Sequence, residues 1–159
     1  MTDEQEFIEL INQHQKIIHK IIRLYTETKD DGADLFQEIL LQAWRSFKKF
    51  RGDALFSTWL YRVGLNTALT FKSQTSHQKH SRPLEATDLV YHDNGLDDQK
   101  EVLYRAIRQL SEVDRVLIGL HLDGYQPEEI GEIAGITANN VSVKLHRIKQ
   151  KLSTLLTKQ

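Results

Sequence analysis

The sequence predicts an all-α protein, with two small helical domains joined by a flexible linker. Apolar side chains recur three and four residues apart in the first and last parts of the chain, which is the spacing of one helix face. Only 2 of the 159 residues are proline, so few positions forbid a helix. Between these parts lies a polar stretch without such periodicity. We therefore expect domains at residues 1–73 and 99–159 and a linker at residues 74–98.

The first domain should contain several helical segments. Apolar residues recur at helical spacing over residues 7–25, and residues 29–32, with sequence KDDG, indicate a break. A second helix is expected at about residues 34–50 and a third at about residues 56–72. The Arg-Gly-Asp sequence at 51–53 indicates the turn between them.

The second domain carries clear start and stop signals for helices. After an amphipathic helix that ends near residue 110, Ser111 can cap the next helix, which should end at Gly124. Pro127 suits the first position of a short helix that Gly135 closes, and Thr137 can cap the last helix. A short helix, a tight turn and a long basic helix in this order predict a helix-turn-helix.

Composition and charge narrow the class of protein. Hydrophobic content of 40% with 27% charged residues is typical of a folded chain. The absence of cysteine excludes disulfides and thiolate metal sites and fits the cytoplasm. The acidic N-terminus is unlike a secretion signal, and no apolar run is long enough for membrane insertion. The sequence shows no cofactor-binding motif.

Charge is strongly partitioned along the chain. Residues 45–72 contain six basic residues and one acid, residues 84–98 contain five acids and no Lys or Arg, and residues 137–159 contain five basic residues and no acid. A single run of this kind is commonly a solvated face. Two basic runs on predicted helices favour contact with nucleic acid.

Side chains that face away from the apolar stripe of the last helix are the candidates for reading DNA. Lys144, Arg147 and Lys151 lie along one flank, which suits phosphate contacts, whereas amide, hydroxyl and methyl groups suit base edges. The alternative is a plain amphipathic hairpin with a basic solvent face. The outward set is Asn139, Ser142, Val143, His146 and Arg147.

The first domain offers two further features. Leu41 faces away from the apolar stripe of its helix among polar neighbours, as the centre of a protein-docking surface would. Residues 50–62 interleave aromatic and basic side chains around a turn, as binders of single-stranded DNA do. An aromatic core with a basic rim is the alternative, because Trp59 could be buried.

Residues 34–44 (DLFQEILLQAW), 50–52 (FRG) and 56–63 (FSTWLYRV) resemble region 2 of the sigma-70 family, in its extracytoplasmic-function (ECF) subgroup. Residues 110–152 are similar to region 4 of that family. Given the short length, we expect neither the extra N-terminal region nor the middle domain of housekeeping sigma factors. The resemblance implies a non-enzymatic transcription initiation factor whose partners are core RNA polymerase and promoter DNA. It also implies a monomer when free and an anti-sigma factor as a further candidate partner.

The resemblance also implies roles for individual residues. The helix at 34–44 would dock on core polymerase, the segment after it would melt the -10 element and capture a flipped base, and the last helix would read the -35 element. Core-binding residues would be Asp34, Gln37, Glu38 and Leu41. Residues at the -10 element would be Arg51, Gly52, Asp53, Ala54, Leu55, Trp59, Arg62 and Asn66. Residues at the -35 element would be Asn139, Ser142, Val143, Lys144, His146, Arg147 and Lys151.

Other classes of protein explain less of the chain. A helix-turn-helix regulator that acts without polymerase core accounts for residues 99–159 but not for the segments around Trp44 and Trp59. A metal-dependent enzyme would rest on His77, His80, His92 and Asp93, which lie in the polar linker without a catalytic motif nearby. A helical adaptor or anti-sigma-like binder is the remaining alternative. DNA binding with and without core polymerase separates these classes.

Overall fold

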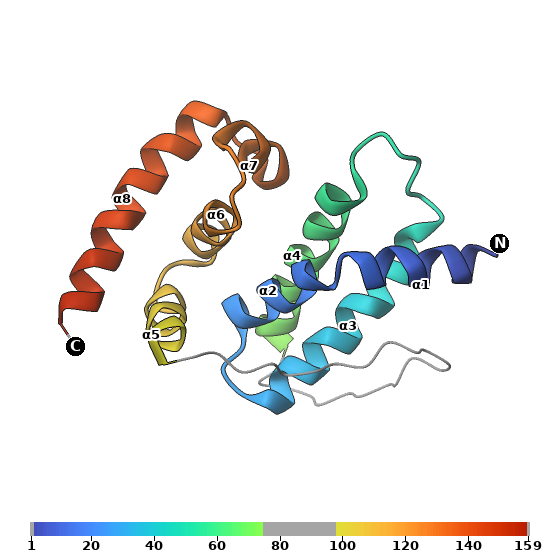
Figure 1. Cartoon of the computed structure of the whole chain (residues 1–159), viewed down its shortest axis with the longest axis horizontal. Helices are drawn as coiled ribbons and strands as arrows, with labels where there is room; N and C mark the ends of the chain where they lie inside the picture. The colour runs from blue at the N-terminus through green and yellow to red at the C-terminus, as the bar shows by residue number, and fades with distance from the viewer. Residues whose placement is uncertain (1, 75–97, 159) are drawn as a thin grey trace. The chain divides into compact units, whose positions relative to one another are not determined.

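The computed structural model describes residues 2–74 and 98–158 and places all regular structure in α-helices (Figure 1). Contacts divide these residues into two compact units, one containing α1 to α4 and the other α5 to α8. The linker expected at residues 74–98, with its histidines, lies almost entirely outside the described residues. Within the described part of the chain, no helix combines the length and apolarity needed to cross a membrane.

The first unit consists of α1 (Asp3–Gln13), α2 (Gln15–Tyr25), α3 (Lys29–Phe47) and α4 (Phe56–Gln74). Helix α4 packs on α2 and α3, and α2 also packs on α3. The apolar stripes predicted from the sequence meet in this core. Its fully buried side chains include Ile11, Ile18, Ile21, Leu35, Phe36, Ile39, Leu40, Ala43, Leu60 and Ala68.

The break predicted at residues 29–32 is wrong. These residues form the first turn of α3, and the chain changes direction just before them, between α2 and α3. The hydroxyl of Thr28 accepts a hydrogen bond from the backbone N–H of Asp31 at 3.1 Å and caps the helix. Asp30 and Asp31 also sit favourably near the positive end of the helix dipole. Cap chemistry therefore outweighs the turn tendency of Asp and Gly here.

The second unit consists of α5 (Asp98–Ile107), α6 (Glu112–Leu122), α7 (Pro127–Ala134) and α8 (Ala138–Thr157). Helix α8 packs against α5, α6 and α7, and α6 packs against α7. The predicted caps are confirmed: Ser111 accepts from the N–H of Asp114, and Thr137 accepts from the N–H of Asn140. Buried side chains of this core include Tyr104, Ile107, Leu117, Ile118, Ile130, Val141, Leu145, Ile148 and Leu152.

The turn between α7 and α8 has the tight geometry that a helix-turn-helix requires. Gly135 adopts a left-handed conformation with φ of 79°. The carbonyl oxygen of Gly131 accepts hydrogen bonds from the N–H groups of Gly135 and Ile136, at 2.8 and 3.0 Å. These bonds satisfy the end of α7 and fix the direction in which α8 leaves it.

Candidate nucleic-acid interfaces

Helix α8 presents an exposed polar face opposite its buried stripe. Val141, Leu145 and Ile148 are buried, whereas the side chains predicted to read bases and phosphates lie outside. Val143 is 47% exposed, so its methyl groups are accessible to a thymine methyl group. The exposed side chains are Asn139, Ser142, Val143, His146 and Arg147.

The predicted basic flank of α8 is less uniform than the sequence indicated. Arg147 is exposed, but Lys144 is only half-exposed. The ammonium group of Lys151 lies 3.9 Å from a carboxylate oxygen of Asp114, at the start of α6. This acid offsets part of the positive charge of Lys151. Among the described residues, Arg147 is therefore the one of the three that is both exposed and without an acid within ion-pair distance.

Contacts inside the second unit hold α8 in place. The buried Arg115 donates from Nε to the carbonyl oxygen of Leu110 at 3.0 Å, which ties α6 to the turn that follows α5. Arg108 pairs with Glu101 at 2.7 Å along the same part of the chain. Burial and, secondarily, the charge of Lys149 on α8 lower the pKa of His121 on α6, which favours its neutral form.

Gly131 controls the approach of α7 to the turn. A Cβ atom at this position would lie 2.5 Å from the backbone carbonyl oxygen of Ile136, which cannot move away without distorting the turn. Sequence reasoning did not single out Gly131, because the close approach arises only when the turn has formed. A glycine four residues before a C-terminal glycine of a short helix is the only local signal.

We expect Gly131→Ala to destabilise the second unit by about 1–3 kcal/mol, because overpacking against backbone forces the turn open. Urea unfolding of the full chain, followed by far-ultraviolet circular dichroism, measures this. Gly135→Asn is the matched control, since nothing lies within 4 Å of a Cβ there and Asn tolerates the left-handed region. Equal stability of wild type and Gly131→Ala would contradict the close approach.

In the first unit, a cluster of aromatic side chains packs together where α1, α3 and α4 come close to the loop between α3 and α4. The ring of Trp59 lies 5.3 Å from those of both Phe50 and Phe56 and 6.3 Å from that of Phe47. Trp59 is therefore half-buried as part of this packing, and only the remainder of its ring is accessible to a base. The cluster consists of Phe7, His14, Trp44, Phe47, Phe50, Phe56 and Trp59.

The loop between α3 and α4 projects from this cluster. Gly52 has φ of 77°, as a sharp turn requires, and Leu55 is 72% exposed, the most of any large apolar side chain among the described residues. Arg51 and Asp53 are exposed, and Ala54 is half-exposed. Arg62 and Asn66 continue the exposed face along α4. The predicted -10 residues thus form a continuous chain segment followed by one helix face.

The predicted docking residues lie together on α3. Leu41 is half-buried, as are Asp34, Gln37 and Glu38, so they form a shallow surface with an apolar centre. Gln42 donates a hydrogen bond to the Glu38 carboxylate at 3.1 Å, which orders the rim of this surface.

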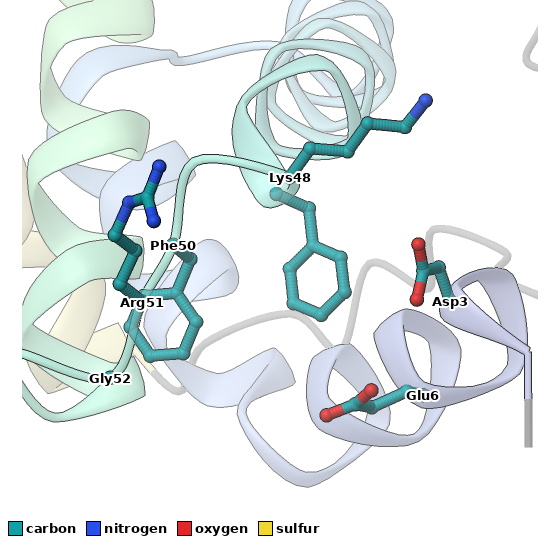
Figure 2. Close-up of a pocket in the computed structure, with 7 residues that line it drawn as sticks. Asp3, Glu6, Lys48, Phe50, Arg51 and Gly52 are labelled. Carbon is teal, nitrogen blue, oxygen red and sulfur yellow. The ribbon is translucent and has the colours of Figure 1, made fainter.

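A pocket of about 410 Å³ lies between the N-terminal turn of α1 and the end of α3. Figure 2 shows Asp3 and Glu6 on one wall, with Phe50 across from them and Gly52 at the edge. The remaining lining residues are Phe47, Lys48 and Arg51. Sequence reasoning missed this pocket. Its acids come from a helix whose place beside α3 rests on the ring contact of Phe7 with Trp44, at 5.1 Å.

Two family models match the chain in succession. The model for Sigma-70 region 2 matches residues 10–78, and that for Sigma-70, region 4 matches residues 100–152. The first match contains α3, the loop and α4, and the second contains α6, α7 and most of α8. The exposed face of α8, the loop with the exposed face of α4, and the docking surface on α3 therefore all lie within the matched regions.

Curated relatives and solved structures agree with these matches. The ECF RNA polymerase sigma-E factor of Escherichia coli K12 is 26% identical over 165 residues, covering 94% of this chain and 86% of its own length. The ECF RNA polymerase sigma factor SigM of Mycobacterium tuberculosis is 26% identical, covering 97% of this chain and 79% of its own. The fold is similar to that of the sigma factor RpoE from Bartonella quintana, solved with the anti-sigma factor NepR. The TM-score is 0.69 at 18% identity, covering 96% of this chain and 98% of that one.

Proposed function

The chain belongs to the sigma-70 family, in its ECF subgroup, and from this membership we infer that it is a transcription initiation factor. It binds core RNA polymerase and directs promoter recognition, DNA melting and initiation. One observation carries this conclusion: regions 2 and 4 follow each other in the chain, and each lies in its own compact helical unit. A helix-turn-helix regulator that acts without core would need only the second unit.

We propose that residues 1–73 bind core polymerase and the -10 element, and that residues 99–159 bind the -35 element. Asp34, Gln37, Glu38 and Leu41 form the docking surface on α3. The loop at residues 51–55, with Trp59, Arg62 and Asn66, opens the -10 element and holds an unpaired base. The exposed loop backbone, the aromatic cluster beside it and the nearby cations support this assignment.

The exposed face of α8 reads the -35 element in this proposal. Asn139, Ser142, Val143 and His146 reach base edges, and Arg147 contacts phosphate. Lys144 and Lys151 contribute less, since one is partly covered and the other is partly neutralised by Asp114.

Arg147→Ala should weaken promoter binding by the holoenzyme and lower the slope of log affinity against log salt by about one, because one phosphate contact is lost. Filter binding across a range of salt concentrations measures this. Lys149→Ala is the matched control: it removes the same charge from the same helix, but that charge acts on His121 of α6. An unchanged slope with altered preference at one base pair would make Arg147 a base reader instead.

The family also guides proposals about partners and location. The solved complex of RpoE with NepR supports an anti-sigma factor as a partner of this chain as well. We propose further that the protein acts in the cytoplasm, has no catalytic activity of its own and is a monomer when it is not bound to a partner.

Reconstitution tests the function directly. Purified core polymerase with this protein should produce transcripts from a defined set of start sites on genomic DNA, each preceded by a common -10 and -35 sequence. Core alone should not. Specific duplex binding by the protein alone, with no change in initiation when core is present, would favour the helix-turn-helix regulator.

A further inference from the structure

The start of α6 places one carboxylate beside the basic flank of α8. Asp114 lies in the first turn of α6, and a carboxylate oxygen of this residue is 3.9 Å from the ammonium nitrogen of Lys151. The two side chains differ in exposure, since that of Asp114 is 17% exposed and that of Lys151 is 66% exposed. The carboxylate is therefore held by its surroundings, whereas the ammonium group lies mostly in water and can turn to another anion.

The ion pair between these two residues is weak enough to be exchanged for a contact with DNA. A hydrogen bond from an ammonium group to a carboxylate is about 2.7–2.9 Å long, so the pair at 3.9 Å is an ionic contact without a direct hydrogen bond. Solvent screens such a pair, and ordering a lysine side chain costs entropy. A DNA phosphate offers the ammonium group a second anion and releases a counterion when it is bound.

Asp114 does not depend on Lys151 for its position. The backbone N–H of Asp114 donates to the hydroxyl of Ser111 at 3.3 Å, and its carboxylate lies near the positive end of the helix dipole. The next residue, Arg115, is buried and bonded to the carbonyl oxygen of Leu110, which fixes the start of α6. The carboxylate of Asp114 therefore remains a fixed negative charge beside α8 when Lys151 turns away.

We propose that Asp114 is a positioning residue for -35 recognition, which holds Lys151 away from the DNA backbone and so limits the number of phosphate contacts that α8 makes. Its carboxylate attracts the ammonium group and repels a phosphate that approaches the same flank. Arg147 lies four residues before Lys151 on that flank and keeps its own phosphate contact. The inference rests on the proposed function, because it requires α8 to lie on duplex DNA.

This arrangement separates affinity from base preference. A phosphate contact strengthens binding to every DNA sequence alike, whereas contacts with base edges depend on sequence. Asp114 therefore weakens binding to all duplex DNA and leaves base preference to the exposed face of α8.

Filter binding of holoenzyme to a mapped promoter, over a range of salt concentrations, tests the proposal. Asp114→Asn should steepen the slope of log affinity against log salt by about 0.9, the value for one added phosphate contact. Between 1 M and 0.1 M salt, that contact adds roughly eightfold to the affinity. The gain should be equal on a promoter with altered -35 bases. Weaker binding or a changed base preference would show that Asp114 only supports the fold, and would overturn the proposal.

A second substitution shows whether the added contact is made by Lys151. Lys151→Ala should lower the slope by less than about 0.3 in the wild type but by about 0.9 in Asp114→Asn. Equal losses in both backgrounds would mean that Lys151 contacts phosphate whether or not the acid is present, and the proposal would be wrong. It would also be wrong if Asp114→Asn left the slope unchanged.

Two further variants separate the position of the charge from its amount. Asp114→Glu keeps the charge and should keep a slope near that of the wild type. Glu112→Gln removes one acid from the same turn of α6 at an exposed position, and residues two apart on a helix do not share a face. An equal rise in Glu112→Gln and Asp114→Asn would assign the effect to total charge and contradict the proposal. Failure of the proposed function appears separately, as absence of promoter binding by wild-type holoenzyme.

Discussion

Replacing residues 51–55 with a glycine-serine segment is expected to abolish promoter opening while leaving the fold and core binding in place. Arg51, Asp53 and Leu55 are exposed, so few packing contacts are lost. At the start of α4 the backbone carbonyl oxygen of Leu55 accepts from the N–H of Trp59 at 3.0 Å, and a serine supplies the same group. The replacement should therefore affect contacts with DNA and leave the stability of the folded protein nearly unchanged.

The expected size of this effect follows from the energy of unstacking. A chain that opens DNA by binding alone must offset a few kcal/mol for each flipped base, and stacking or a fitted pocket returns about 1–3 kcal/mol. Losing that return slows opening by about 5- to 150-fold. Permanganate reactivity of thymines near the -10 element should vanish, and run-off transcription with it.

A promoter template with a premelted bubble is the control for this loop. The bubble removes the energy of unstacking and leaves every other contact, so the loop-replaced protein should regain part of its transcription. Normal opening of linear duplex promoters by that protein would show that the loop does not capture the base. Loss of core binding would show instead that the segment supports the docking surface.

Most of the fold could be predicted because local signals coincide with the tertiary structure. Ser111, Pro127, Gly135 and Thr137 each mark a helix end by their own chemistry, and the structure uses each one as predicted. The four residues at 29–32 were misread because their Asp and Gly residues favour turns as well as first helical turns. The deciding group was Thr28, whose cap outweighs that tendency.

The sequence could indicate the parts of a candidate site whose residues lie close together in the sequence. The outward residues of α8 could be named from helical spacing, and the loop could be named from the aromatic and basic side chains around its turn together with the resemblance to region 2. Contacts between residues far apart in the sequence could not be predicted in this way. Asp114 beside Lys151 and the rings packed on Trp59 join residues far apart in the sequence. Asp3 and Glu6 likewise line one pocket with Phe50 because α1 lies beside the end of α3.

Leu41→Glu is expected to weaken binding of core polymerase by about 2 kcal/mol or more, roughly 30-fold in affinity, which is the loss typical of a hot-spot residue. Leu41 is half-buried on the outer side of α3, with Gln37 and Glu38 beside it. A third carboxylate there replaces the apolar centre of the surface and adds repulsion from Glu38. The core of the unit does not depend on Leu41, since Leu40 and Ile39 fill the buried side.

Competition for core with a labelled sigma factor measures this loss, and thermal unfolding of the free protein verifies the fold. Leu41→Met keeps an apolar group and should bind within about twofold of wild type. Gln13→Glu adds the same charge at an exposed position of α1 and should leave the affinity unchanged, which separates a local effect from a change in net charge. Wild-type affinity in Leu41→Glu would place the docking surface elsewhere on the first unit. Equal loss in Leu41→Glu and Gln13→Glu would show that core responds to total charge, and that the shallow apolar centre on α3 has no special part in docking.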